Sequence, residues 1–291
     1  MRTVNCLVGG ADHPSSNGRT FERRNPVSGL VVTRAAAATL DDAQAAVAAA
    51  SSAFPIWSAL TPNERRRRLL KAADSLASRA SEFAATGIDE TGGTPGERII
   101  VDESIADAFV KKLPVKAKTL LAGDPAKGFA LLGAVASPDT VHGLKSLIED
   151  ATEKGATIVA SGTSETAIMD ATVVDHVTPE MRLNYEESFG PLVAVTRVRN
   201  DEQAVCAANG TEYGLSAAVF GSDTSRALQV ASRIDSGICH INSATVHDEP
   251  QMPFGGVKAS GFGRFGGRYA VHEFTELQWI TVQTTPPHYP I

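Results

Sequence analysis

From residue 97 onward, short apolar runs typical of buried strands alternate with longer segments of helical periodicity. The strand-like runs are "RIIVD", "ATIVASG", "PLVAVTRV", "LSAAVF" and "ICHIN", and the helix-like segments include "DEQAVCAAN" and "TSRALQVASRIDSG". Residues 137–155 read as a further helix, with a serine cap, a proline in the first position and a terminal glycine. This alternation predicts an α/β domain built on a mostly parallel sheet with helices on its faces.

Two further segments carry weaker signals. Residues 104–121 have helical character, but Pro114 lies inside them and predicts a kink or an early end. The segment "LQWITVQ", residues 277–283, alternates apolar and polar residues and predicts a last strand, followed by a proline-rich tail.

The N-terminal part of the chain predicts two helices with clear start signals. Thr39 caps the first helix, and Asp42 stands where a capping box needs an acidic side chain. The second helix starts with Thr61 as cap, a proline in the first position and Glu64 in the third. Its apolar stripe continues to Phe83, so we expect one continuous helix to that point.

Composition narrows the classes of protein that remain. The chain has 291 residues, of which 43% are hydrophobic and 21% charged, and a net charge of -6. This balance argues against a nucleic-acid or anionic-membrane surface. "RRRR", Arg65 to Arg68, could mark a basic patch, but four consecutive helical residues point around most of the helix, so we interpret them as a solvated helix end. The sequence shows neither a signal-peptide core nor an apolar run of about 18 residues, which predicts a cytoplasmic protein with no membrane segment.

Two short motifs look functional but lack their required context. "GFGRFG", residues 261–266, matches the dinucleotide fingerprint G-x-G-x-x-G, yet a loop precedes it and no acidic residue follows about 20 positions on. "HEFTE", residues 272–276, lacks the second histidine of a zinc H-E-x-x-H motif. We therefore predict a glycine-rich loop and a surface helix end, and no metal site.

Four longer stretches occur in a fixed order: "YEESFGPLV" (185–193), "NGTEYGLSAAVF" (209–220), "SGICHIN" (236–242) and "PFGGVKASGFGR" (253–264). Together they resemble the C-terminal half of the aldehyde dehydrogenase superfamily. The stretch "CHINSATVHDEPQMPFGGVKASGFGRFGG" is most similar to members that act on aromatic aldehydes, the salicylaldehyde and vanillin dehydrogenase type. The first helices resemble the N-terminal part of the same family, so the resemblance covers nearly the whole chain.

The resemblance implies a defined reaction. A cysteine thiolate attacks the aldehyde, hydride passes to NAD or NADP, and a glutamate activates water to hydrolyse the thioester. An asparagine side chain and a backbone N–H stabilise the oxyanion. The implied substrate is an aldehyde and the implied product a carboxylic acid.

The catalytic parts of this pattern are absent from the sequence. The family cysteine belongs just before "ERIIVDE", but "GGTPG", residues 92–96, stands there. The general-base motif "ELGGK", the "PWN" segment of the oxyanion asparagine and the "FTGS" cofactor loop are also missing. By the family pattern roughly 200 residues are lacking between the second helix and this strand, most of a domain. We therefore expect no catalytic residue in this chain.

The three cysteines do not replace the nucleophile. Cys206 falls within "DEQAVCAAN", where we expect a packed helix face, and Cys6 falls in a short predicted strand. Cys239 lies beside His240, but neighbours on a strand point to opposite faces and form no dyad. All three are read as structural cysteines in a reducing compartment.

Half of a site remains by resemblance. Glu187 matches the glutamate that hydrogen-bonds the nicotinamide ribose, and Phe189 matches the aromatic residue against the nicotinamide. Asn242, Val246 and His247 fall in the loop that lines the substrate entrance. The alternative for "EESFGP" is a simple turn into a strand.

The domain prediction has three parts. Residues 1–94 form a mostly helical remnant of the NAD-binding domain, and residues 97–275 form the catalytic-type α/β domain. Residues 276–291 carry the strand that pairs across subunits in this family, followed by the tail. The partner hairpin of that strand falls in the missing region, so its open edge invites homo- or hetero-oligomerisation.

Three hypotheses follow for the whole chain. The first is an internally deleted aldehyde dehydrogenase family protein that is inactive alone. The second is a non-catalytic subunit that joins full-length relatives through "LQWITVQ". The third is a residual thiol esterase using Cys239. In each case the first two helices expose apolar faces, which predicts low stability or association.

Overall fold

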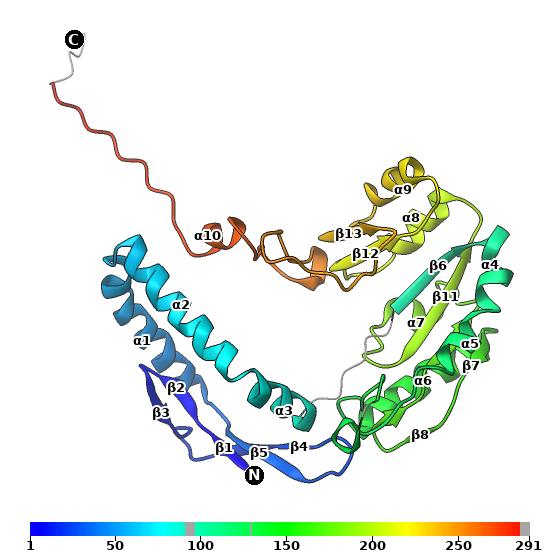
Figure 1. The fold of residues 1–291 in the computed structure, drawn as a ribbon, viewed down its shortest axis with the longest axis horizontal. Coiled ribbons are helices and arrows are strands. Elements are labelled where there is room, and N and C mark those ends of the chain that lie inside the picture. Colours follow the sequence, from blue (N-terminus) through cyan, green and yellow to red (C-terminus); the bar gives the residue numbers. More distant parts are fainter. Residues whose placement is uncertain (91–96, 129, 286–291) are drawn as a thin grey trace. The chain divides into compact units, whose positions relative to one another are not determined.

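The computed structural model describes residues 1–90, 97–128 and 130–285 (Figure 1). The junction "GGTPG" and the end of the proline-rich tail lie outside the described residues. The chain divides into two compact units: Met1–Ile99 with Ile105–Arg197, and Ile100–Ser104 with Val198–Ile291. The domain boundaries expected from the sequence stay a prediction.

The N-terminal segment contains five short strands before its first helix. A three-stranded sheet has the order β1-β5-β4, in which β5 runs parallel to β1 and antiparallel to β4. The β2–β3 pair is a hairpin, which confirms the strand expected around Cys6. The others were not predicted, because β1, β3 and β4 are exposed and the residues of β5 show no alternation of apolar and polar side chains. The bounds are β1 (Arg2–Val4), β2 (Cys6–Val8), β3 (Ala11–His13), β4 (Thr20–Arg24) and β5 (Val31–Ala36).

Three helices follow: α1 (Leu40–Ser58), α2 (Pro62–Ser78) and α3 (Ala80–Glu90). Both predicted capping boxes are present, since the cap hydroxyl accepts from the third residue and that residue's carboxylate accepts from the cap amide. The continuous second helix expected to Phe83 is wrong. Arg79 leaves the helical conformation, with φ −109° and ψ 14°, and its guanidinium forms a fork with Glu82 in the next helix.

The apolar faces of α1 and α2 are exposed, as the sequence predicts. None of the residues in either helix is buried. Large side chains remain open to solvent, among them Leu40, Val47, Phe54, Leu69 and Leu76. Their helical conformation therefore depends on capping and local contacts, because burial of an apolar stripe is what usually stabilises a helix.

The start of α1 should be sensitive to acid. The Asp42 carboxylate accepts from the Thr39 amide (2.8 Å) and the Ser16 amide (3.2 Å), which lowers its pKa to about 2. A depressed carboxyl pKa gives stability that is complete above the ordinary pKa near 4 and is lost as the pH falls toward 2. We expect an NMR titration of the Asp42 side-chain carbon to have its midpoint near 2, and Thr39→Val to raise that midpoint. A wild-type midpoint near 4 would contradict the capping geometry.

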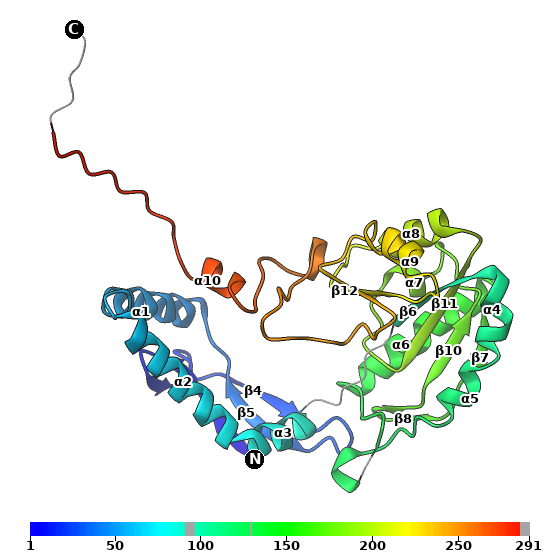
Figure 2. The ribbon, with the colours of Figure 1, turned by 45° about the horizontal axis from the view of Figure 1, so that its top comes forward.

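A four-stranded sheet within residues 97–198 has the order β6-β11-β10-β7 (Figure 2). β10 runs parallel to β11, as predicted, and antiparallel to the edge strand β7. Leu144, Leu147, Met181, Val174 and Leu192 belong to its core cluster. The bounds are β6 (Glu97–Asp102), β7 (Thr157–Ala160), β10 (Thr172–Asp175) and β11 (Leu192–Val198).

Helices lie beside this sheet in both views (Figures 1 and 2). The early end predicted at Pro114 is confirmed, because α4 stops at Val110 and Pro114 stands in the first turn of the next helix. The bounds are α4 (Glu103–Val110), α5 (Leu113–Ala117), α6 (Pro138–Glu153) and α7 (Arg182–Tyr185), with the hairpin β8 (Ser164–Glu165) and β9 (Ile168–Met169) and the 3₁₀ turn η1 (Pro125–Lys127).

The second unit contains a parallel pair, β12 (Ser216–Val219) and β13 (Ile238–Ile241). Its helices α8 (Asp201–Asn209) and α9 (Thr224–Ala231) are those predicted from the sequence. The turn η2 (Lys258–Ser260) and the short helix α10 (Tyr269–Glu273) follow. Of the helices in the described ranges, none is long and apolar enough to cross a membrane.

The strand predicted over residues 277–283 is wrong for the single chain. These residues have no regular secondary structure, and Leu277 and Trp279 are 95% and 92% exposed. A strand exists only where a neighbour accepts its hydrogen bonds, and no described segment pairs with this one.

Candidate functional site

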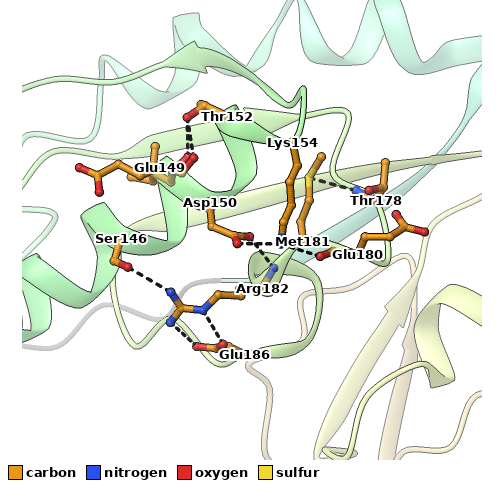
Figure 3. Close-up of polar contacts among 11 residues, drawn as sticks. Ser146, Glu149, Asp150, Thr152, Lys154, Thr178, Glu180, Met181, Arg182 and Glu186 are labelled. Carbon is orange, nitrogen blue, oxygen red and sulfur yellow. Dashed lines mark hydrogen bonds and ion pairs between the residues drawn. The ribbon is translucent and has the colours of Figure 1, made fainter.

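One polar face of α6 holds the segment that leads into "EESFGP". Ser146, Asp150 and Lys154 follow one another at four-residue intervals and therefore share a face (Figure 3). Lys154 Nζ lies 2.7 Å from Asp150 Oδ1 and donates to the Glu180 carbonyl at 2.8 Å. Asp150 Oδ2 accepts from the Arg182 amide at 2.9 Å. The hydrogen bond from Lys154, then that from the Arg182 amide, holds the pKa of Asp150 below its usual range.

Arg182, the first residue of α7, joins this face to the next loop. Its Nε and Nη2 donate to the two carboxylate oxygens of Glu186 at 2.7 and 2.9 Å, and its Nη1 donates to Ser146 Oγ at 3.0 Å (Figure 3). The paired hydrogen bonds raise the pKa of Arg182 and lower that of Glu186. A further guanidinium, that of Arg98 on β6, donates to the Asn184 carbonyl at 3.1 Å. The short helix is thus fixed by side chains from two other elements.

Glu187 and Phe189 lie together in the turn after α7. Phe189 has φ 49°, a left-handed conformation that is rare for an aromatic residue, and its side chain is 71% exposed. Glu187 is exposed and forms no ion pair with the residues described. Behind them Gly190 is buried, and a Cβ there would overlap the Leu144 side chain. The turn presents a carboxylate and an aromatic ring outward from a tightly packed base.

Asn242 stands in the second unit, at the end of β13, with φ 56°. Its amide oxygen accepts from the Gly221 N–H and its amide nitrogen donates to the Gly221 carbonyl, both at 2.9 Å. Its own N–H donates to the Val219 carbonyl at 2.9 Å. The side chain therefore joins the loops that follow β12 and β13, and this geometry fixes where the candidate substrate loop begins.

The loop itself carries Val246 and His247. Its Thr245 carbonyl accepts from Ser216 Oγ at 2.7 Å, and Val246 is 77% exposed. His247 packs edge-on against His240 with ring centroids 5.5 Å apart. Its Nε2 also lies 3.5 Å from a Glu249 carboxylate oxygen. The buried Nε2 of His240 has no hydrogen-bond partner among the described residues.

The predicted site residues therefore fall in two groups. Glu187 and Phe189 are brought together in the first unit, whereas Asn242, Val246 and His247 lie together in the second. Within each group the residues share one loop. The roles assigned to them by resemblance stay predictions.

None of the cysteines is placed as an activated nucleophile. Cys239 is partly buried, and burial raises the pKa of its thiol, which disfavours the thiolate. Cys6 lies in β2 and is also partly buried. The prediction that Cys206 lies on a packed face is wrong, because it is exposed while its neighbour Val205 makes the contact with the core.

The two short motifs that lacked their functional context in the sequence also lack it in the structure. The "GFGRFG" loop follows a 3₁₀ turn instead of a strand, and Phe262 is fully exposed. The first part of "HEFTE" is the end of α10. Across residues 1–90, 97–128 and 130–285, no group of three or more His, Cys, Asp or Glu side chains is arranged to hold a metal.

Helix N-termini are the usual sites for dinucleotide phosphates. In the described chain, each helix of eight or more residues carries its own polar or acidic side chain at this end. The residues are Thr39 and Asp42 (α1), Thr61 and Glu64 (α2), Glu82 (α3), Asp102 (α4), Ser137 (α6), Asn200 (α8) and Asp223 (α9). At the capped ends a side-chain oxygen therefore already accepts from one or two of the free N–H groups that a pyrophosphate would use, and an acidic side chain at the cap or in the first turn opposes a second negative charge.

Sequence reasoning missed the residues that support the Glu187–Phe189 turn. Arg182 and Glu186 are four residues apart, and Ser146, Asp150 and Lys154 repeat at the same interval. Both patterns were visible in the sequence as polar residues at four-residue spacing. The contact between the two groups was not visible, because 32 to 36 residues separate their members.

Comparison with known proteins gives the family. Two segments, residues 13–97 and 93–280, match the model of the aldehyde dehydrogenase family. The chain belongs to the aldehyde dehydrogenase family. A vanillin dehydrogenase of Pseudomonas fluorescens is 33% identical over 482 aligned positions that span all of both chains. A salicylaldehyde dehydrogenase of Pseudomonas putida is 46% identical over 195 residues, which is 67% of this chain and 40% of that relative.

Solved structures agree with this assignment. A salicylaldehyde dehydrogenase from Pseudomonas putida G7, complexed with salicylaldehyde, superimposes with a TM-score of 0.89 over 100% of both chains at 27% identity. An NADP-dependent glyceraldehyde-3-phosphate dehydrogenase from Bacillus halodurans C-125, complexed with NADP, matches 60% of this chain and 37% of its own, with a TM-score of 0.57 and 33% identity. The α/β fold predicted from the sequence is confirmed.

This aldehyde dehydrogenase chain is shorter than the relatives that it matches over their full length. The two matched segments meet at residues 93–97. Alignment with the vanillin dehydrogenase covers 482 positions, whereas this chain has 291 residues. Roughly 190 positions of the relative therefore have no counterpart, which is the size of a domain.

Proposed function

We propose that this chain is a catalytically inactive aldehyde dehydrogenase family protein. The observation that carries the proposal is the absence of a cysteine before Glu97, where the resemblance puts the nucleophile. Cys239 does not compensate, because burial raises its thiol pKa. Without a thiolate there is no thiohemiacetal from which hydride could leave.

The cofactor role is limited to one half of the dinucleotide. Glu187 and Phe189 form an outward turn that suits a ribose hydroxyl pair and an aromatic ring, so these residues fit the nicotinamide half of NAD or NADP. The capped helix N-termini do not fit its pyrophosphate. Bound NAD or NADP would supply the hydride acceptor. This chain's contribution is to orient the nicotinamide ribose.

The substrate class belongs to the same proposal. Vanillin and salicylaldehyde appear in the names of several relatives, which supports an aromatic aldehyde as the ancestral substrate. Asn242, Val246 and His247 then line its entrance loop. The acidic composition supports a protein without a nucleic-acid partner. Three scattered cysteines fit a reducing compartment, which supports a cytoplasmic location.

An activity assay tests the proposal. The purified chain is incubated with NAD⁺ or NADP⁺ and with salicylaldehyde, vanillin or benzaldehyde, and formation of the reduced cofactor is followed by absorbance. We expect a rate at least about 10⁴-fold below that of a full-length relative, the usual cost of losing the nucleophile. Cys239→Ser is the matched control and should leave the background unchanged. Cysteine-dependent formation of reduced cofactor would refute inactivity.

A second function is favoured by the exposed segment at residues 277–282. Leu277, Trp279, Ile280 and Val282 are each at least 70% exposed, and an extended apolar segment of this kind can pair with the edge strand of another chain. This supports a non-catalytic subunit that joins full-length relatives. Co-purification of a tagged chain with such a relative tests it. The double variant Trp279→Ser with Ile280→Asp should abolish capture, and strictly separate elution of the unmodified chains would exclude it.

A further inference from the structure

The Glu187–Phe189 turn is costly to hold in its observed shape. A non-glycine residue in the left-handed region is strained and persists only where its surroundings enforce it. Phe189 is 71% exposed, so its own side chain supplies little of that enforcement. The restraint must come from the residues on either side of the turn.

On the C-terminal side the restraint is packing. Gly190 is buried against Leu144 of α6, and the Pro191 carbonyl accepts from the Thr172 amide at 2.8 Å, which anchors the turn to β10. These contacts fix the position at which the chain leaves the turn. They leave Glu186 and Glu187 on the other side without an anchor.

On the N-terminal side the restraint is polar and centres on one side chain. The Glu186 carboxylate is gripped at both oxygens by Arg182, and the same guanidinium donates to Ser146 of α6. A fork of this kind fixes the direction of a carboxylate as well as its distance. The residue held is the immediate neighbour of Glu187, so the fork restrains the backbone at the point where the turn begins.

We propose that Arg182 is a positioning residue, which holds the Glu187–Phe189 turn in its nucleotide-presenting shape by tying Glu186 to Ser146. Arg182 does not touch the nucleotide in this arrangement. The expected effect on nucleotide binding rests on the proposed role of Glu187 and Phe189. The expected effect on the order of the turn does not depend on that role.

Hydrogen exchange of the full chain, resolved by mass spectrometry, tests the ordering. The Glu186 amide donates to the Arg182 carbonyl at 2.9 Å and reports opening of the segment. We expect Arg182→Gln to speed exchange in the peptide that contains residues 184–190 by about threefold, as for a partly exposed forked ion pair. The exchange of β11 should not change. Arg182→Lys, with one donor group in place of the fork, should restore part of the protection.

A matched control separates this effect from the loss of any surface ion pair. Arg226 forms the same forked contact with Asp201, at 2.9 and 2.6 Å, in the other unit. Arg226→Gln should leave exchange at residues 184–190 unchanged. Ser146→Ala removes a single hydrogen bond from the network and should give a smaller local increase, which keeps the test decisive if Arg182→Gln does not fold.

Nicotinamide mononucleotide is the probe for the second readout, because it lacks the adenylate half. We expect Arg182→Gln to weaken its binding about threefold, with Arg182→Lys between the variant and the wild type. Unchanged exchange at residues 184–190 in both Arg182→Gln and Ser146→Ala would overturn the inference, and so would an increase spread equally over β11. If the wild type does not bind the mononucleotide, the proposed role of Glu187 falls, and the exchange result still decides the role of Arg182.

Discussion

Replacing Arg197 by methionine is expected to lower the free energy of unfolding by about 3 kcal/mol, because it leaves the Asp175 carboxylate buried without its partner. Asp175 ends β10 and is 2% exposed. Arg197 on β11 donates to both of its oxygens, at 3.2 and 2.7 Å, and to Asp107 at 2.6 Å. The arginine side chain is 19% exposed. We therefore expect a loss of unfolding free energy at the lower end of the range for breaking a fully buried ion pair.

The pH dependence of this pair has a definite sign. Burial alone would raise the pKa of Asp175, but hydrogen bonds from Arg197 and from the His176 amide lower it below its usual range. Its contribution to stability is therefore complete above the ordinary pKa near 4 and is lost as the pH falls below it. The difference between wild type and Arg197→Met should be largest near neutral pH and should shrink at pH values below about 4.

Urea unfolding followed by circular dichroism measures this effect, with hydrogen exchange of β10 and β11 identifying the transition. Arg199→Met is the matched control, since Arg199 and Glu103 are 77% and 59% exposed at 3.4 Å. It should change stability by less than about 0.5 kcal/mol. Adding Asp175→Asn to Arg197→Met should recover part of the loss. A cost below about 1 kcal/mol for Arg197→Met would show that the pair is not desolvated.

Alanine at Gly190 is expected to destabilise the protein, whereas alanine at Gly143 should stabilise it. A Cβ on Gly190 would overlap Leu144 Cδ1 and lie 3.1 Å from Cδ2, and Leu144 is 1% exposed and has no room to move. Overpacking of this kind costs about 1–3 kcal/mol. Gly143 is on the exposed side of α6 with open space around it, so Gly143→Ala should gain about 0.5–1 kcal/mol of helix stability.

A double-mutant cycle tests whether the cost of Gly190→Ala comes from the clash with Leu144. Leu144→Ala alone should cost about 3–4 kcal/mol, because it empties a fully buried site. With the leucine shortened, Gly190→Ala has space for its methyl group, so the double variant should cost less than the sum of the single ones. Additive costs in urea unfolding would mean that Gly190 is required for another reason.

Local sequence signals predicted the elements whose start and end are decided within a few residues. The capping residues of α1, α2 and α6 were identified correctly because a cap involves only its own first turn. α8, over Asp201–Asn209, begins and ends at the predicted residues. The strands β11, β12 and β13 were recognised from short apolar runs between such helices.

Features that depend on distant partners were not predictable in the same way. The strands β1, β3 and β4 are exposed and show little apolar alternation, β5 is partly buried but also lacks it, and pairing stabilises all four instead. Residues 277–283 show the reverse. They alternate apolar and polar side chains as a strand would, but they form no strand because no neighbouring strand among the described residues is available to pair with them. Cys206 is the next residue after the buried Val205. A helix of nine residues is too short for its periodicity to show which of the two neighbours faces the core.

The order of residues along the chain was sufficient to assign the family and to select Glu187 and Phe189 as candidate site residues. Only the tertiary structure decided how Glu187 and Phe189 are presented. The fork from Arg182 to Glu186 is local, whereas the hydrogen bond from Arg182 to Ser146 and the packing of Gly190 on Leu144 join segments that are far apart in the chain. Such contacts form when α6 and α7 pack around one core. The pattern of polar residues along the sequence does not show which of them will be in contact after packing.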